Sequence, residues 1–232
     1  MATQKVVVGG SSVTAGQMKD FWRQIDDGSI NFETLQAYLE HRNPFDVSLI
    51  DWFKVYEVLG MSAGYIKFAK ANEVALVAKS GLWTVPILKG VTCNKVIATF
   101  KKLKVDVYQY INDLDADVTE NDRDPNKTGP YAVSFAANVE ADENLKNLSA
   151  NQLKKQNVKG VTLLERLVLE LGYFLTTGKH LDEKNVTLCS GSRDSVGRVP
   201  YVNWRVDARR LGVRWCNPDD ADDDLRARAV VS

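Results

Sequence analysis

The sequence is short of cysteine, and its few cysteines are not spaced for cross-linking. Three cysteines occur among 232 residues, and no two of them form a CxxC pair. An odd number without paired spacing predicts neither a disulfide framework nor a zinc site. We therefore expect a protein of the reducing cytoplasm, in which the Asn-X-Ser/Thr sequons stay unmodified.

Long apolar runs and an excess of one charge are missing as well. The first residues contain only a short apolar run, residues 6–8, and no stretch approaches the roughly 20 apolar residues that a bilayer crossing needs. Lysine plus arginine and aspartate plus glutamate each number 30. We expect no signal peptide, no membrane partner and no general affinity of the whole protein for nucleic acid.

The composition is that of a folded chain. Hydrophobic residues make up 44% and charged residues 26%, which are ordinary values for folded proteins. A chain of this length buries one large core or two small ones. The apolar spacing predicts an α+β fold, with a helical N-terminal region over residues 1–72 and a mixed α/β domain over residues 73–232 that ends in an antiparallel β-hairpin.

The N-terminal region contains several signals for helices. Thr14 and Gln17 have the spacing of a capping box, and apolar residues follow at helical intervals up to Gly28. Ser48 and Asp51 resemble a second capping box. The further helices that we expect cover residues 32–40, 49–59 and 62–71.

The pattern changes after residue 72. Residues 74–78, 82–88, 105–111 and 131–139 favour strands, with Pro86 placing its strand near an edge. Residues 94–103 favour a helix. The polar, acidic segment 112–130 is either an ordered loop or a linker.

The clearest element is a helix after Thr162. Thr162 and Glu165 form a capping box, and Gly178 supplies a left-handed stop. Leu167 and Leu171 lie in the middle of its apolar stripe, so we expect them to be among the most buried residues. Strands are expected afterwards over residues 185–189, 199–206 and 211–216, the last two joined by a tight turn.

This C-terminal half also carries a resemblance. The segment GVTLLERLVLELGYFLTTGKHLDEKNVTLCSGSRDSVGRVPYVNW, with ENDRDPNK upstream, resembles a module of uncharacterised bacterial hypothetical proteins, mostly from uncultivated lineages. That family has no assigned activity. The resemblance therefore implies a reusable folded unit and no site residues.

The acidic segment is a candidate site for calcium or another divalent cation. Asp113, Asp115 and Asp117 match the first three acidic positions of a calcium-binding loop, because hard cations need several convergent oxygens. Val118 stands where such a loop has glycine, and Asp124 where it has a closing glutamate. The competing interpretation, which we favour, is a solvated acidic loop that binds no metal.

The turn over residues 190–198 is a candidate ligand site. Ser190, Ser192, Arg193 and Arg198 could bind a phosphate or carboxylate through backbone N–H groups and a guanidinium. The turn lacks the glycine-lysine signature of a phosphate-binding loop. A connection between two strands requires small residues in any case, and we favour that interpretation.

Nucleophilic catalysis has one candidate group. Cys189 has His180 and Asp182 nearby in the sequence, and a thiolate nucleophile needs a base within hydrogen-bonding distance. Cys189 ends an apolar strand, where a cysteine is typically a small buried hydrophobe. We favour the buried thiol.

The C-terminal part separates charge along the chain. Residues 179–216 carry an excess of basic side chains, and Tyr201, Trp204 and Trp215 lie among them. This combination suits a polyanion or single-stranded nucleic acid, but it also suits core tryptophans beside a solvated arginine face. Five aspartates between Asp219 and Asp224 lead us to expect that the tail folds over the basic hairpin and that the fold does not need it.

Two functional classes follow from these features. We favour a non-catalytic interaction or scaffold protein whose partner is another protein, with no cofactor. The alternative is a ligand- or metal-dependent hydrolase whose carboxylates and arginines meet only in the fold. A cleft that brings the acidic segment to Arg193 and Arg198 would favour the enzyme.

Overall fold

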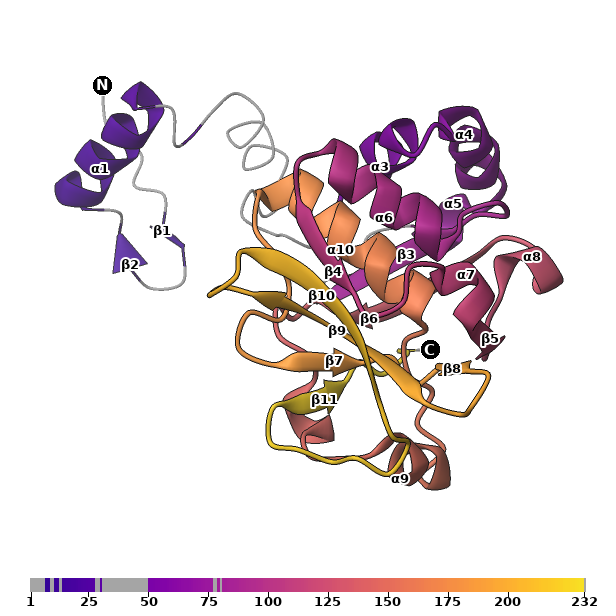
Figure 1. Cartoon of the computed structure of the whole chain (residues 1–232). Coiled ribbons are helices and arrows are strands. Elements are labelled where there is room, and N and C mark those ends of the chain that lie inside the picture. Colours follow the sequence, from indigo (N-terminus) through magenta and orange to yellow (C-terminus); the bar gives the residue numbers. More distant parts are fainter. Residues whose placement is uncertain are drawn as a thin grey trace. The chain divides into compact units, whose positions relative to one another are not determined.

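The computed structural model describes residues 7–8, 11–12, 14–27, 30, 50–76, 79 and 81–231 (Figure 1). The chain divides into two compact units, Met1–Asp46 and Val47–Ser232, and we describe each by itself. The boundary expected after residue 72 stays a prediction. Among the helices that the structure describes, none has the length and apolarity that a bilayer crossing requires.

The first unit contains a short antiparallel pair, β1 (Val7–Val8) and β2 (Ser11–Ser12), and the helix α1 (Ala15–Asp26). The predicted capping box at the start of α1 is confirmed, because Thr14 accepts from the Gln17 backbone while the Gln17 side chain accepts from Thr14. None of the described residues of α1 is buried. The helix expected over residues 32–40 lies outside the described residues.

The second unit begins with three helices, α3 (Trp52–Val58), α4 (Ser62–Ala71) and α5 (Glu73–Leu76). Asp51 caps α3 by accepting from Lys54 N, so the capping residue is not the Ser48 that the sequence indicated. The strand expected over residues 74–78 is wrong, because residues 73–76 form a helical turn. A short apolar run fits either structure, and spacing alone does not separate them.

A two-stranded antiparallel sheet contains β3 (Leu82–Ile87) and β6 (Tyr131–Ala136), with Leu82 opposite Ala136 and Ile87 opposite Tyr131. Among the described strands β3 pairs with β6 alone, so β3 lies at an edge, where proline is tolerated. The predicted edge position of this strand is confirmed. After β3 comes α6 (Cys93–Lys102), which confirms the helix expected over residues 94–103 with its bounds shifted by one residue.

The main sheet has five strands in the order β11-β7-β9-β10-β4. The sequence predicts the antiparallel pair β9 (Val199–Arg205) and β10 (Arg210–Cys216) correctly. β4 (Asp106–Gln109) runs parallel to β10, and β11 (Leu225–Ala227) runs parallel to β7 (Val186–Leu188). The α+β fold class, with helices first and an antiparallel hairpin near the end, is therefore confirmed.

The polar segment 112–130 is ordered and is not a linker. It contains α7 (Leu114–Asp117), β5 (Val118–Asn121) and α8 (Pro125–Thr128). β5 pairs antiparallel with β8 (Ser192–Asp194). This pairing brings the acidic segment against the turn that the sequence singled out as a ligand site.

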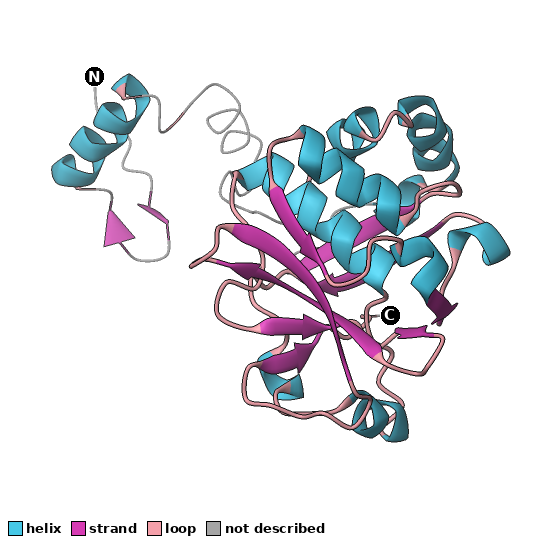
Figure 2. Ribbon diagram, in the orientation of Figure 1, coloured by secondary structure: helices cyan, strands magenta, loops and turns pink. Residues whose placement is uncertain are grey.

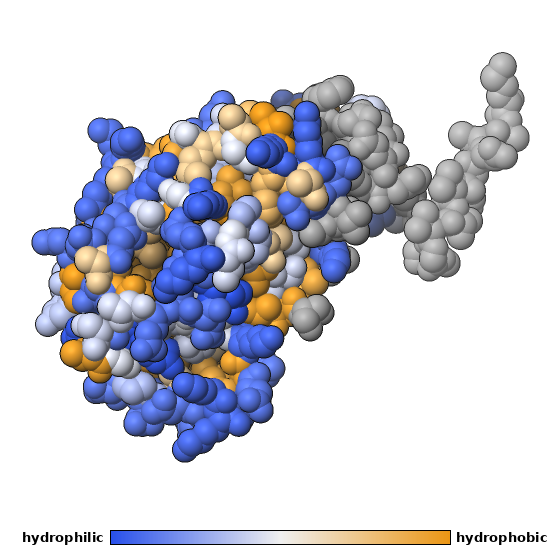
Figure 3. Space-filling view, turned by 90° about the vertical axis from the view of Figure 1, so that its right-hand side faces the viewer, coloured by the Kyte–Doolittle hydropathy of each residue, from blue (hydrophilic) through white to orange (hydrophobic). Residues whose placement is uncertain are grey.

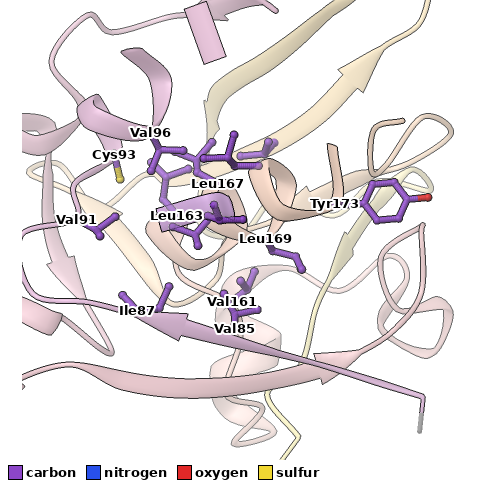
Figure 4. Close-up of a cluster of buried hydrophobic side chains, with 14 of the residues drawn as sticks. Val85, Ile87, Val91, Cys93, Val96, Val161, Leu163, Leu167, Leu169 and Tyr173 are labelled. Carbon is purple, nitrogen blue, oxygen red and sulfur yellow. The ribbon is translucent and has the colours of Figure 1, made fainter. Parts of the chain in front are cut away.

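Helix α10 (Leu163–Thr177) forms the centre of the core. Its capping box at Thr162 and its left-handed stop at Gly178, with φ of 67°, are both as predicted. It packs against α3, α6, β3 and β9 (Figure 1). Leu167 and Leu171 are fully buried, which confirms that prediction. Figure 4 shows this cluster, with Leu163, Leu167 and Leu169 pointing among the side chains of neighbouring elements.

A smaller apolar cluster lies on the other face of the five-stranded sheet. Figure 2 shows most helices of this unit on one side of that sheet, with α9 (Ala150–Lys155) on the other. A 3₁₀ turn over Glu143–Leu145 joins this side. The buried members of the smaller cluster are Leu145, Ala150, Leu153, Leu188, Val199, Leu225 and Ala227.

The structure corrects the prediction of a dispensable tail. Leu225 and Ala227 are buried in the smaller cluster and belong to β11. Arg228 is fully buried as well. The tail contributes the strand β11 to the sheet. Leu225, Ala227 and Ala229 alternate with arginines, which is a strand pattern that the sequence analysis did not recognise because of the charged residues.

Candidate functional site

The pairing of β5 with β8 forms one wall of a polar cleft. Glu120 lies opposite Arg193, and Asn121 lies opposite Ser192. Between these strands and α9 lies a cleft of about 450 Å³. Its charged and hydroxyl-bearing lining includes Glu120, Asp122, Lys127, Lys154, Ser190 and Arg193. Figure 3 views the molecule from the side that carries α7, α8, β5 and β8, where hydrophilic residues predominate.

Arg193 is the one predicted ligand residue whose charge faces this cleft. Its Nη1 donates to the carbonyl oxygens of Ser190 (2.8 Å) and Ser192 (2.7 Å). Within the described residues its Nε and Nη2 make no hydrogen bond and no carboxylate lies within salt-bridge distance. Burial lowers the pKa of Arg193, although Asp122 and Glu120 oppose this shift. The guanidinium thus has free N–H groups in a partly desolvated position, where a carboxylate or phosphate binds well.

The other predicted ligand residues are placed differently. Ser190 lines the cleft, and its Oγ is buried with no partner in the described structure. Ser192 lies beneath the cleft, where its Oγ accepts from Leu163 N (2.9 Å) and contacts Asn121 Oδ1 (2.6 Å). Arg198 does not line the cleft, because its Nε binds Asp194 at 2.6 Å.

The predicted metal ligands have local structural roles. Asp113 caps α7 by accepting from Ala116 N, and it also accepts from the Asn94 side chain at 2.7 Å. Asp115 accepts from Asn94 N at 3.2 Å. Asp124 caps α8 by accepting from Asn126 N.

Asp117 is the remaining predicted ligand. Burial raises its pKa, and the neighbouring Asp194 adds to this shift. One of its carboxylate oxygens is buried without a hydrogen-bond partner in the described structure. Across the described ranges, no group of three or more histidine, cysteine, aspartate or glutamate residues is arranged to hold a metal ion.

A buried ionic network lies beside the cleft, and sequence reasoning missed it. Asp182 is fully buried and binds two fully buried arginines, Arg166 through Nη2 and Arg228 through Nη2, both at 2.8 Å. Ala141 N and the hydroxyl of Thr187 also donate to it. Burial alone would raise the pKa of Asp182, but Arg228 and Arg166 hold it below the ordinary value of 3.8.

The same network contains Glu170 and His180. Arg166 Nη1 binds Glu170 at 2.7 Å, and Glu170 binds His180 Nδ1 at 2.8 Å. The His180 ring is stacked between Phe174 and Trp204, with centroids at 4.9 and 3.4 Å. The signal available in the sequence was the Arg-x-x-x-Glu spacing inside an otherwise apolar helix, which places both charges on one face.

This network also settles the Cys189 candidate. Asp182 and His180 bind arginine and glutamate, while the one hydrogen bond of Cys189 Sγ within the described residues goes to the Thr187 carbonyl oxygen at 3.9 Å. Cys189 is fully buried, and burial raises the pKa of its thiol. The favoured interpretation, a buried thiol, describes this residue.

A second ion pair joins Arg123 to the buried Glu165. Glu165 accepts from Arg123 Nε (2.7 Å), Arg123 Nη2 (2.8 Å), Tyr131 Oη (2.8 Å) and Thr162 N (2.8 Å). Burial opposes ionisation of Arg123, but Glu165 raises its pKa. Glu165 was identified only as a capping residue, and nothing local in the sequence indicated its partner Arg123.

The fold and the cleft define an α+β protein with a polar, charge-lined cleft beside a buried ionic core. No protein-family model, curated protein or solved structure matches this chain. The resemblance of its second half to bacterial hypothetical proteins therefore stays a prediction.

Proposed function

We propose that this chain is a non-catalytic binding protein that takes an acidic group of another protein into the cleft between β5, β8 and α9. The supporting observation is Arg193, a half-buried guanidinium whose Nε and Nη2 have no partner within the described residues. A guanidinium fork in this state binds a carboxylate in bidentate fashion.

The rest of the lining fits a peptide side chain or terminus better than a whole folded surface. A volume of about 450 Å³ lies in the range of sites for small ligands and short segments. Lys127 and Lys154 flank the cleft with two further positive charges, while Glu120 and Asp122 would repel a highly charged polyanion. A single acidic side chain or a C-terminal carboxylate is the partner group that this mixture favours.

A cytoplasmic location is part of the proposal. All three cysteines are free thiols, two of them buried, as expected for a protein that folds under reducing conditions.

The proposal is tested with a short glutamate-rich peptide with a free C-terminus, titrated into the protein at low salt by calorimetry. We expect Arg193→Ala to weaken binding about tenfold or more, because a charged hydrogen bond is worth ~1.5–3 kcal/mol. Arg193→Lys keeps the charge but loses the fork, so it should recover only part of the affinity.

Lys155→Ala provides the matched control, since Lys155 is exposed on α9 but does not line the cleft. Equal affinities for Arg193→Ala and Lys155→Ala would show that the effect is general electrostatics and would refute the cleft as the site. Thermal unfolding of each variant checks that the turn at Ser190 survives.

A second candidate function rests on the carboxylates of the same cleft. Glu120 and Asp122 line it together with Arg193, and neither side chain makes a hydrogen bond within the described residues. A hydrolase needs only two carboxylates placed by the fold. Turnover of a panel of glycoside and phosphoester substrates, with and without calcium, that is abolished by Asp122→Asn would favour this enzyme over the binding protein.

A further inference from the structure

A second surface, which shares no residue with the cleft, lies on the face of the main sheet that also carries the smaller apolar cluster, over β4, β10 and β9. Residues directly opposite each other on neighbouring strands share a face. In the register of β4, β10 and β9, Arg210 lies between Asp106 and Arg205, Gly212 between Tyr108 and Asn203, and Arg214 beside Tyr201. We call this set the arginine–tyrosine face: Asp106 and Tyr108 of β4, Tyr201, Asn203 and Arg205 of β9, and Arg210, Gly212 and Arg214 of β10.

The tryptophans of the hairpin lie on the opposite face. Trp204 and Trp215 pack against the main core. The aromatic residues that accompany the arginines are therefore tyrosines, and of these Tyr201 also packs against the smaller apolar cluster. The core position of both tryptophans agrees with the competing interpretation.

Tyr108 is held between two arginines. The guanidinium carbons of Arg210 and Arg214 lie 4.9 and 5.2 Å from the centroid of its ring. Tyr108 remains 37% exposed, and Tyr110, just beyond the end of β4, is 64% exposed. Neither Arg210 nor Arg214 has a carboxylate partner in the described part of the chain, whereas Arg205 is paired with Asp207 at 2.6 Å.

Gly212 and Asn203 pack closely at the centre of the face, and the Asn203 amide oxygen is buried there. Gly212 has no side chain, and a Cβ there would lie 3.1 Å from Asn203 Oδ1. That amide oxygen has no hydrogen-bond partner in the described structure. The Asn203 side chain therefore lies over the buried Gly212, beside the exposed ring of Tyr108 and two guanidinium groups that pair with no carboxylate of the described residues.

We propose that the arginine–tyrosine face binds single-stranded nucleic acid, with a base stacked near Tyr108 and phosphates bound by Arg210 and Arg214. Aromatic side chains on a sheet face stack unpaired bases, and arginines beside them bind the backbone.

An acidic peptide fits this face less well. A peptide would use the arginines but would leave the exposed rings of Tyr108 and Tyr110 without a partner, whereas a base is itself flat and aromatic. The balanced charge of the whole chain does not conflict with this proposal, because the face itself carries three arginines and one aspartate.

The test uses the full chain and fluorescent oligonucleotides of about 12 nucleotides, one of thymidine and one of uridine, at several salt concentrations. We expect Tyr108→Ala to weaken binding about 5- to 150-fold through lost stacking, and Tyr108→Phe to bind like the wild type. Arg214→Ala should reduce the slope of log affinity against log salt by about 0.7. A difference between the two oligonucleotides would show whether RNA or DNA is preferred, and tight binding of either supports the proposal.

Three controls separate this proposal from general electrostatics and from the cleft. Lys70→Ala removes an exposed charge from α4 and should leave binding unchanged. Arg193→Ala should also leave it unchanged, so that failure of the cleft proposal does not affect this one. Equal binding by Tyr108→Ala and wild type, or equally effective competition by polyglutamate, would overturn the proposal, as would an absence of binding at low salt.

Discussion

Two helices of this chain begin with the same kind of cap but differ in how deeply they are buried. α1 and α10 both start with a complete capping box, formed by Thr14 and Gln17 in one and by Thr162 and Glu165 in the other. Among its described residues α1 has none buried, whereas α10 has ten of fifteen buried. The cap sets where a helix begins, and it carries no information about how deeply the helix is buried.

The difference arises from partners that are distant in the sequence. The apolar stripe of α10 meets α3, α6 and β3, and its charged face meets Asp182, which also binds Arg228. Burying Arg166 and Glu170 would be strongly unfavourable without these partners. α10 is thus buried on its polar side as well, because the C-terminal tail supplies the charge that closes the network.

Removing the tail should have the largest effect of the changes that we predict. Truncation after Cys216 deletes β11 with its buried Leu225 and Ala227, and it removes Arg228 from Asp182. We expect loss of cooperative unfolding, because a buried charge loses a partner and the smaller cluster loses two members. Circular dichroism during heating and limited proteolysis would measure it.

The full-length chain with Asp219, Asp220, Asp222, Asp223 and Asp224 changed to asparagine is the matched control. All five lie before β11 and none is buried, so this variant should keep a cooperative transition. A truncated chain that unfolds as cooperatively as the full-length one would contradict the role assigned to the tail.

Asp182→Asn should have the next largest effect. It leaves Arg166 and Arg228 buried with Glu170 as the remaining carboxylate, and breaking a buried ion pair costs about 3–5 kcal/mol. Urea denaturation at pH 7 would measure the loss in the free energy of unfolding. Asp106→Asn, at an exposed position on β4, should leave that free energy unchanged.

The effect of Asp182→Asn on the free energy of unfolding should depend on pH. The pKa of Asp182 is lowered in the folded protein, so its contribution to stability is complete above the ordinary value of 3.8 and is lost as the pH falls through the lower folded value. The difference in unfolding free energy between wild type and Asp182→Asn should therefore shrink below pH 4. A difference that stays constant down to pH 2 would show that Asp182 does not act through its charge.

Much of the fold could be predicted from local pattern. The capping boxes, the Gly178 stop and the β9–β10 hairpin are encoded within a few residues, and each is present. The short apolar run near Val74 could not be assigned, because four residues do not distinguish a strand from a helical turn. β11 was not predicted because arginines alternate with the apolar residues in this part of the chain. Arg228, which follows the strand, is buried because it pairs with Asp182.

The cleft was predicted only in part, for the same reason. Small residues around Arg193 suggested an anion site, but the contribution of Glu120 and Asp122 depends on the pairing of β5 with β8. Those strands lie more than 70 residues apart in the chain. Pairing at that distance is a property of the whole fold and leaves no local signal in the sequence.

Leu167→Ala compares the apolar stripes of the two helices. Leu167 is fully buried in the core, and truncating it should cost about 2–5 kcal/mol through lost burial and the cavity left behind. Met18→Ala removes a similar volume from α1, where Met18 is 43% exposed, and should change the free energy of unfolding by less than about 0.5 kcal/mol. Equal costs would mean that the stripe of α1 is as tightly packed as that of α10.

The smallest effect should come from the caps themselves, where the two helices are most alike. Thr162 Oγ1 accepts from Glu165 N at 3.3 Å and Thr14 Oγ1 accepts from Gln17 N at 3.2 Å. Replacing either threonine by alanine removes one capping bond, which costs about 0.5–2 kcal/mol.

Burial should make Thr162→Ala more costly than Thr14→Ala. Thr162 is fully buried, so Thr162→Ala leaves the Glu165 N–H with no water to replace the lost oxygen, and its cost should lie at the upper end of that range. Thr14 is exposed, so water compensates in part and amide exchange in the first turn of α1 should accelerate only slightly. Thr162→Ser keeps the oxygen and should recover most of the loss measured by urea denaturation. If Thr162→Ser and Thr162→Ala cost the same, the methyl group of Thr162, and not its hydroxyl, would be the part that stabilises α10.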